Sequence, residues 1–385
     1  MITKTHTILS AFAASMVTAA LCGAAVLPGG GVPPVGTPGG PTNRLTPADE
    51  ATWLAGRAIF DKRFNRAEGL GTPEMNADSC RACHQDPVLG GAGGLELNVS
   101  RFAKDNNGAG PFENLAGGQG ASKLRPPWEA GRENIHPDAD VFEQRQTPSA
   151  LGLGLLDAIP NSAILANEDP DDLNGDFIIG KARILMVNGQ PEVGRFGWKA
   201  QIPRLADFVD DAMAGETGIT TPDNGRGFNL SADADSVADP ELSAGEVDDL
   251  AFFLLNLGPP IRTGSTSALV VRGEQVFTEV LCSRCHIPSM PSPNGPVFAY
   301  TDLLLHDVMP VNFRGMSEPG AESGFYRTPP LWGIKDTAPY MHDGRAEDLP
   351  GAIAAHFGEA DQVRQNYEAL TDREKTALIL FLQDL

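Results

Sequence analysis

Two short stretches of this 385-residue sequence carry the same reactive residues at the same spacing. They read CRACH at residues 80–84 and CSRCH at residues 282–286. In such a stretch two thioethers can hold a haem ring, and the adjacent histidine can bind its iron. A zinc site would need a fourth ligand at each motif, and a thioredoxin-like dithiol would need a strand followed by a helix. The pair therefore favours two covalently bound c-type haems. The residues that would hold them are Cys80, Cys83 and His84, and Cys282, Cys285 and His286.

The N-terminus predicts export. Lys4 precedes an apolar run over residues 8–26 that ends in small residues, which is the pattern of a secretory signal cleaved near Ala24 or Ala25. In an oxidising compartment each Cys-x-x-Cys pair could also close a small disulfide. An uncleaved membrane anchor and lipidation of Cys22 are the alternatives, but the apolar run is short and the residues before Cys22 match a lipoprotein signal poorly. We therefore expect a periplasmic protein.

Each haem motif lies within a similar order of predicted elements. A helical pattern with Gly, then an aliphatic residue, then Phe at i, i+3, i+4 spacing precedes each motif. A second helical pattern with a capping box closes each half. The sequence thus predicts a mainly α protein with two cytochrome c-like haem domains and long loops. The matching residues are Gly56, Ile59 and Phe60 with Gly273, Val276 and Phe277, and the capping pairs are Ser243 with Glu246 and Thr371 with Glu374.

Composition and the positions of glycine and proline predict the segment boundaries. The 43 glycines and 31 prolines predict a loop-rich chain, and Gly258-Pro259-Pro260 marks the junction of the two halves. The formal net charge of −21 disfavours nucleic acid and anionic membranes, and it favours a partner protein with a basic surface. The expected segments are 1–25 (signal), 26–44 (Pro/Gly-rich linker), 45–259 (N-terminal domain with the haem at His84) and 260–385 (C-terminal domain with the haem at His286).

Stretches outside the haem motifs resemble the bacterial di-haem cytochrome c peroxidase superfamily. The similarity covers about residues 45–385 and is strongest to the branch of di-haem oxidoreductases or peroxidases, which is thiol oxidoreductase-like. The resemblance implies an enzyme that reduces hydrogen peroxide at the N-terminal haem, with electrons relayed by the C-terminal haem from a small donor protein. An electron-transfer cytochrome, or a di-haem enzyme that oxidises a partner protein, are the alternatives, and members can form homodimers. The stretches are GLGLLDAIP, DPDDLNGD, GRFGWKA, TDLLLHD, RTPPLWG, YMHDGRA and AIAAHFGEA.

The resemblance implies a second axial ligand for the C-terminal haem. In the superfamily this ligand follows a Thr-Ala-Pro-Tyr segment, here residues 337–340, and the matching position is His356. Other members have Met or Tyr there; because His lowers a haem potential relative to Met, we expect a closed, low-spin, low-potential haem. The family also holds calcium with backbone carbonyls that match Thr337 and Pro339. The acidic stretch 169–176 lacks the first Asp of an EF-hand loop, and we expect a solvated turn there.

The sequence leaves open which group, if any, occupies the distal side of the N-terminal haem. Other members carry a removable His where Ser100 stands. His136, water or an open position are the alternatives, and an open iron could bind peroxide. The acid-base Glu of the family matches Glu216, for which an ordinary surface carboxylate is the alternative, and the family's distal Gln position falls on or near Phe208.

The remaining residues that the resemblance singles out lie between or beside the haems. Trp198 matches a Trp through which electrons cross between the haems; simple core packing is the alternative. Its neighbours Arg195 and Lys199 are expected partners of the haem propionates. His306 and His342 each precede an Asp, which can orient an imidazole, and both are expected near the second haem without binding its iron.

Overall fold

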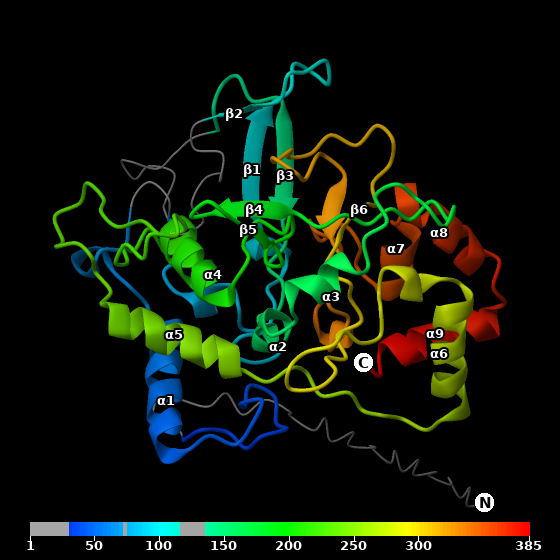
Figure 1. The fold of residues 1–385 in the computed structure, drawn as a ribbon, viewed down its shortest axis with the longest axis horizontal. Coiled ribbons are helices and arrows are strands. Elements are labelled where there is room, and N and C mark those ends of the chain that lie inside the picture. The colour runs from blue at the N-terminus through cyan, green and yellow to red at the C-terminus, as the bar shows by residue number, and fades with distance from the viewer. Residues whose placement is uncertain (1–30, 72–74, 116–134) are drawn as a thin grey trace, which may run out of the picture.

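The computed structural model describes residues 31–71, 75–115 and 135–385, and it is mainly helical with short strands and long loops (Figure 1). The predicted signal segment lies outside these residues. The longer helices are α1 (Pro47–Asp61), α4 (Leu205–Ala212), α5 (Ala244–Asn256), α6 (Ala268–Glu279), α8 (Asp361–Glu368) and α9 (Asp372–Leu382). The shorter helices are α2 (Leu153–Asp157), α3 (Asn161–Leu165) and α7 (Leu349–Ala354).

Helices α1 and α5 cross closely in the N-terminal half. Any side chain on Gly56 would clash with the carbonyl oxygen of Asp249, so only glycine permits this approach. The buried rings of Phe60 and Phe253 then meet with centroids 5.5 Å apart. The start of α5 carries the predicted capping box at Ser243. The predicted helical face and cap of this half are therefore confirmed.

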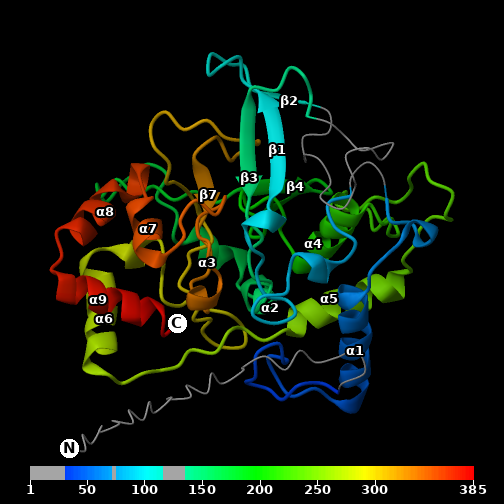
Figure 2. The ribbon, with the colours of Figure 1, turned by 180° about the vertical axis from the view of Figure 1, so that it is seen from behind.

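Helices α6 and α9 repeat this crossing in the C-terminal half. A side chain on Gly273 would clash with the carbonyl oxygen of Ala377, and the rings of Phe277 and Phe381 meet 5.4 Å apart. The capping box at Thr371 is also present. Figures 1 and 2 show the two helix pairs on opposite sides of the molecule. The internal repeat read from the sequence thus extends to the packing of its helices.

Each helix pair has its own apolar core. The core around α1 and α5 also contains Met290 and Trp332, which come from beyond the predicted boundary at residue 259. The core around α6 and α9 is formed within residues 270–385. The second half of the chain therefore contributes to both cores, and the two halves share packing at their junction.

Short strands stand between the helix pairs. Strand β1 (Val99–Lys104) pairs with β3 (Val141–Arg145) and with β2 (Glu113–Asn114), all antiparallel. Two hairpin-like pairs lie below this sheet in Figure 1. They are β4 (Ile184–Val187) with β5 (Gln190–Val193), and β6 (Leu305–Asp307) with β7 (Phe325–Arg327).

The end of the Pro/Gly-rich segment is docked against the N-terminal half. The backbone N–H of Thr42 donates to the carbonyl of Asn256 over 2.7 Å, and that of Gly258 donates to the carbonyl of Gly40 over 2.8 Å. The predicted linker thus closes over the end of α5. Within the described ranges, none of the helices combines the length and the apolar character needed to cross a bilayer.

Candidate functional site

A continuous cavity of about 460 Å³ connects the two CxxCH motifs. It runs between the helix pairs and receives side chains from both halves. The residues predicted to hold or serve the haems therefore meet in one space. Those that line it are Cys80, Cys83, His84, Cys282, Cys285, His286, His356, Glu216, Trp198, Thr337 and Pro339.

The first motif forms a 3-10 turn over Cys80–Ala82 that presents His84 to the cavity. The Nδ1 of His84 lies 3.1 Å from the carbonyl oxygen of Gly91, which fixes the ring and leaves Nε2 for a metal. The ring of Phe60 packs 6.2 Å from the imidazole. Burial lowers the pKa of His84, so the ring is neutral and able to ligate iron.

The second motif has the same geometry over Cys282–Arg284. The Nδ1 of His286 lies 3.0 Å from the carbonyl of Tyr300. Just after the end of α7, the Nδ1 of His356 lies 2.7 Å from the carbonyl of Ala352. Burial, and after it the nearby His356, lowers the pKa of His286 to about 4. Both imidazoles are partly buried, they interact electrostatically, and each uses Nδ1 on a backbone carbonyl, which leaves Nε2 available and fits a pair of axial ligands.

The cysteines of both motifs are free thiols. Burial raises the pKa of Cys80 to about 12, and it raises the pKa of Cys282 to about 12 as well. A redox dithiol works through a thiolate, which the opposite shift would favour. Partly buried, protonated thiols beside an oriented histidine fit covalent haem attachment at both motifs.

Two carboxyl groups line the cavity on the side of the first motif. Glu216 lies in a π-helical turn over Met213–Thr217, and the side-chain amide of Asn76 donates to its Oε2 over 3.0 Å. Asp211 lies one turn earlier, and burial followed by the charge of Glu216 raises its pKa to about 7. The sequence reasoning missed Asp211. The feature that could have indicated Asp211 is an acidic residue next to the apolar face of α4.

The position of the removable histidine has become part of a sheet. Ser100 pairs with Gln144 across β1 and β3 and accepts a hydrogen bond from its side-chain amide over 2.6 Å. The neighbouring Arg101 lines the cavity. His136 is not a lining residue; its Nδ1 accepts a hydrogen bond from the N–H of Asp138 over 3.2 Å. The structure therefore places His136 outside the site, in a turn of its own.

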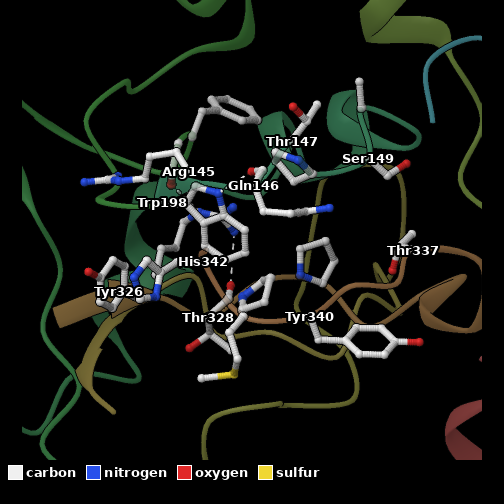
Figure 3. A pocket seen from close by; sticks show the side chains of 18 of the residues that line it. Arg145, Gln146, Thr147, Ser149, Trp198, Tyr326, Thr328, Thr337, Tyr340 and His342 are labelled. Atoms are coloured by element: carbon white, nitrogen blue, oxygen red, sulfur yellow. Dashed lines mark hydrogen bonds between the residues drawn. The ribbon is translucent and has the colours of Figure 1, made fainter. Parts of the chain in front are cut away.

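Trp198 lies in the wall of the cavity, beside Gln146 and His342 (Figure 3). Its indole N–H donates to the carbonyl of Gln146 over 2.8 Å, and its ring meets His342 edge-on at 6.5 Å. His342 in turn stacks on Tyr326 at 3.8 Å. The indole thus contacts segments from both halves of the chain, and it is fixed by both.

The two His-Asp pairs occupy different places. His306 lies 3.7 Å from Sγ of Cys285 and between the carboxylates of Asp302 and Glu359, at 2.9 and 2.7 Å. Burial opposes its charge, but Cys285 and Asp302 raise the pKa of His306 well above the usual range. Burial lowers the pKa of His342 well below the usual range. His306 is therefore beside the second motif as expected, whereas His342 packs on Trp198.

Arg195 and Lys199, the expected partners of the haem propionates, point away from the cavity. The guanidinium of Arg195 donates to the backbone carbonyls of Asp157, at 3.1 Å, and of Ile159. The ammonium of Lys199 donates to the carbonyl of Glu322 over 2.7 Å. Neither cation lines the cavity, so the prediction for both is corrected. The arginines that do line it are Arg101, Arg145, Arg327 and Arg364, which the sequence reasoning missed.

An oxygen donor lies close to the predicted calcium position. Asn98 is buried, and its side-chain amide donates to the carbonyl of Asp343 over 3.0 Å. Its Oδ1 accepts no hydrogen bond from the part of the chain that the structure describes. Only three residues separate Pro339 from Asp343, so this oxygen fits a hard cation held also by Thr337 and Pro339.

The acidic stretch 169–176 is a turn, as predicted. Oδ1 of Asp169 accepts the N–H of Leu173 over 2.8 Å, and Oδ1 of Asp172 accepts the N–H of Phe177 over 3.1 Å. The carboxylates are thus used by the backbone of the loop itself. The stretch is not among the groups of metal-ligating side chains found in the described residues.

Comparison with known proteins gives a family and structural relatives. The profile of the family described as "Di-haem oxidoreductase, putative peroxidase" matches residues 131–385. No curated protein sequence matches the chain. Among solved structures, a MauG-like protein associated with microbial copper homeostasis is 15% identical, with 92% of this chain and 91% of that chain covered and a TM-score of 0.45. The diheme peroxidase BthA from Burkholderia thailandensis is 16% identical, with 89% and 86% covered and a TM-score of 0.46. The hydrazine synthase of Kuenenia stuttgartiensis is 15% identical, with 91% and 95% covered and a TM-score of 0.42.

Proposed function

Because the chain belongs to the di-haem oxidoreductase family, we propose that it is a periplasmic peroxidase that reduces hydrogen peroxide at its N-terminal haem. One peroxide, two electrons and two protons give two waters. The observation that supports this proposal is that the two motif histidines, His84 and His286, have different surroundings in the cavity. His356 lies against His286, whereas the groups that act on His84 are the backbone carbonyls of Gly91 and Pro148, not a second histidine.

The chain's own residues would divide the work of holding the haems. Cys80 and Cys83 would attach one haem and Cys282 and Cys285 the other, with His84 and His286 as proximal ligands. Bound haem iron supplies the electron-accepting centre that the side chains lack. His356 would close the second iron, which suits electron relay and leaves substrate binding to the first.

The carboxyl pair on the side of the first motif would move the protons. Asp211 has a pKa of about 7, raised by burial and by Glu216, which is close to the pH at which the enzyme would work. Glu216 is oriented by its hydrogen bond from Asn76. The pair would accept a proton from peroxide and return one to it, which is the proton transfer that O–O cleavage requires.

Trp198 would carry the electrons across the wall between the haems. Its indole is held on one side by the carbonyl of Gln146 and on the other by the ring of His342. This support favours a fixed ring over a merely space-filling one, because packing alone does not require the hydrogen bond. The peroxide electrons would then come from a small donor through the C-terminal haem.

Electron paramagnetic resonance of the resting protein, followed by stopped-flow addition of peroxide, tests the proposal. We expect one high-spin and one low-spin iron, and peroxide-dependent oxidation of a donor. Two low-spin irons and no reaction with peroxide would identify an electron carrier instead. Rapid reaction with peroxide that consumes a partner protein's side chains, rather than a soluble donor, would identify the partner-oxidising alternative.

A further inference from the structure

A loop over residues 168–177 holds two large apolar side chains in solvent. Leu173 is 86% exposed and Phe177 is 80% exposed. Leu165, at the end of the preceding helix α3, is also exposed. Scattered exposed apolar residues are ordinary, but a group of them on one loop indicates a contact surface.

The loop is built to keep this shape. The carboxylates of Asp169 and Asp172 accept the N–H groups of Leu173 and Phe177, as described above. Asp172 and Phe177 have φ angles of 47° and 64°, in the left-handed region that an aromatic residue rarely adopts. Phe177 thus combines a strained backbone conformation with an exposed ring, and core packing explains neither feature.

Two short connections join the loop to the second haem motif. Oδ2 of Asp176 lies 3.8 Å from Nε of Arg284, which is inside CSRCH. The N–H of Ile179 donates to Oε2 of Glu359 over 3.0 Å, and Glu359 contacts His306 beside Sγ of Cys285. In Figures 1 and 2 the segment after α3 runs beside α8. The exposed side chains thus lie at the outer edge of the second motif.

The loop is also strongly acidic. Residues 168–177 contain no Lys or Arg, and the whole chain has a formal net charge of −21. Such a surface attracts a basic partner and repels an acidic one. Its acidic residues are Glu168, Asp169, Asp171, Asp172 and Asp176.

We propose that the 168–177 loop is the docking surface for the electron donor, a small basic redox protein with an apolar patch around its own redox centre. Leu173 and Phe177 pack on that patch, the loop carboxylates orient the basic rim, and electrons enter at the Cys285 side of the C-terminal haem. The inference rests on the proposed function, in which that haem receives the electrons. Small, salt-sensitive interfaces are typical of such transient electron-transfer encounters.

The test is anaerobic reduction of an oxidised basic blue-copper protein by the reduced holoprotein, without peroxide, followed by the loss of the blue colour. Electron transfer from a low-potential haem to the copper is downhill, and it uses the same encounter surface as the reverse transfer. The double variant Leu173→Ser, Phe177→Ser should lower the second-order rate by about tenfold or more. Asp171→Asn should lower it about two- to fivefold at low salt and flatten its salt dependence. Val311, 99% exposed and outside this loop, provides the matched control Val311→Ser, which should react as the wild type does.

Two further measurements separate docking from other steps. Hexaammineruthenium(III), which needs no docking surface, should oxidise the reduced double variant at the wild-type rate, because this variant changes no charge. Binding of the zinc-substituted donor, which transfers no electrons, should weaken about tenfold in the double variant and stay unchanged in Val311→Ser. Wild-type rates and binding in the double variant, or a preference for an acidic donor, would overturn the docking proposal. Normal electron exchange with the blue-copper protein, in a protein that does not reduce peroxide, would overturn the proposed function alone.

Discussion

The partner of Nδ1 decides whether a cavity histidine can bind iron. In His84, His286 and His356, Nδ1 lies at hydrogen-bond distance from a backbone carbonyl, and Nε2 is then available for iron. His306 instead has a carboxylate on each nitrogen, which fixes its ring beside Cys285. The difference between ligand and support is thus made by the partner of each nitrogen, not by the residue type.

Replacing His356 by Ala should open the second iron. The resting wild type is expected to show one high-spin iron, and His356→Ala should show two, because the variant loses the imidazole that acts most strongly on His286. Electron paramagnetic resonance counts the high-spin signals. His136→Ala is the control and should leave the count unchanged, since His136 lies outside the cavity. An unchanged count in His356→Ala would exclude His356 as a ligand.

Asp211→Asn should change how stability depends on pH. Burial raises the pKa of Asp211 from 3.8 to about 7 in the folded protein. The stabilising contribution of its protonated form is therefore complete below about pH 4 and is lost as the pH rises through about 7. We expect Asp211→Asn to be more stable than the wild type at pH 8, and this advantage should shrink toward pH 4.

Thermal unfolding at a series of pH values measures this difference. The exposed Asp171→Asn serves as the matched control, because water solvates its charge in both states. Parallel curves for Asp211→Asn and the wild type would contradict the raised pKa of Asp211, and with it the proposed proton donor.

At the scale of elements, each half depends on a glycine where two helices cross. Gly56 lets α1 approach α5, and Gly273 lets α6 approach α9. The same crossings bring Phe60 and Phe277 next to the haem motifs that follow their helices. The repeat in the sequence is therefore a repeat of close helix contacts that position the two motifs.

Gly273→Ala should destabilise the protein by about 1–3 kcal/mol, because the new methyl group forces α6 and α9 apart. Gly245→Ala is the matched control on α5: nothing lies near its added methyl group, and a helix gains about 0.5–1 kcal/mol from this change. Denaturant unfolding of the holoprotein measures both. Equal stability of Gly273→Ala and the wild type would show that the crossing tolerates a wider spacing.

At the scale of the whole molecule, the cavity is made by neither half alone. Cys80 and Glu216 reach it from one half, and Cys285 and His356 from the other. Contacts such as that between Asn98 and Asp343 cross between the halves. The relative placement of the two haem motifs therefore depends on this junction.

Calcium should strengthen the junction. Because Oδ1 of Asn98 is buried and accepts no hydrogen bond from the described residues, a cation held with Thr337 and Pro339 would satisfy it. Added calcium should raise the unfolding free energy by about 2.7 kcal/mol at a hundredfold excess over its Kd. Asn98→Ala should bind calcium about tenfold more weakly by titration calorimetry, whereas Asn366→Ala on α8 should bind as the wild type does. Equal calcium affinity in Asn98→Ala and the wild type would contradict a calcium site at Asn98.

The sequence by itself determined what depends on spacing along the chain. The two CxxCH motifs, the helix faces at Gly56 and Gly273, and the caps at Ser243 and Thr371 are all local patterns. Local geometry follows from a few neighbouring residues, so the structure agrees with these patterns. The resemblance added His356, which the structure places against His286.

Only the tertiary structure decided which side chains face the cavity. It brought Asp211 beside Glu216 and left His136 outside. It also turned Arg195 and Lys199 toward backbone carbonyls, which no sequence spacing reveals. The physical reason is that a side chain's direction is set by partners distant in sequence, because each buried donor must find an acceptor when the halves pack.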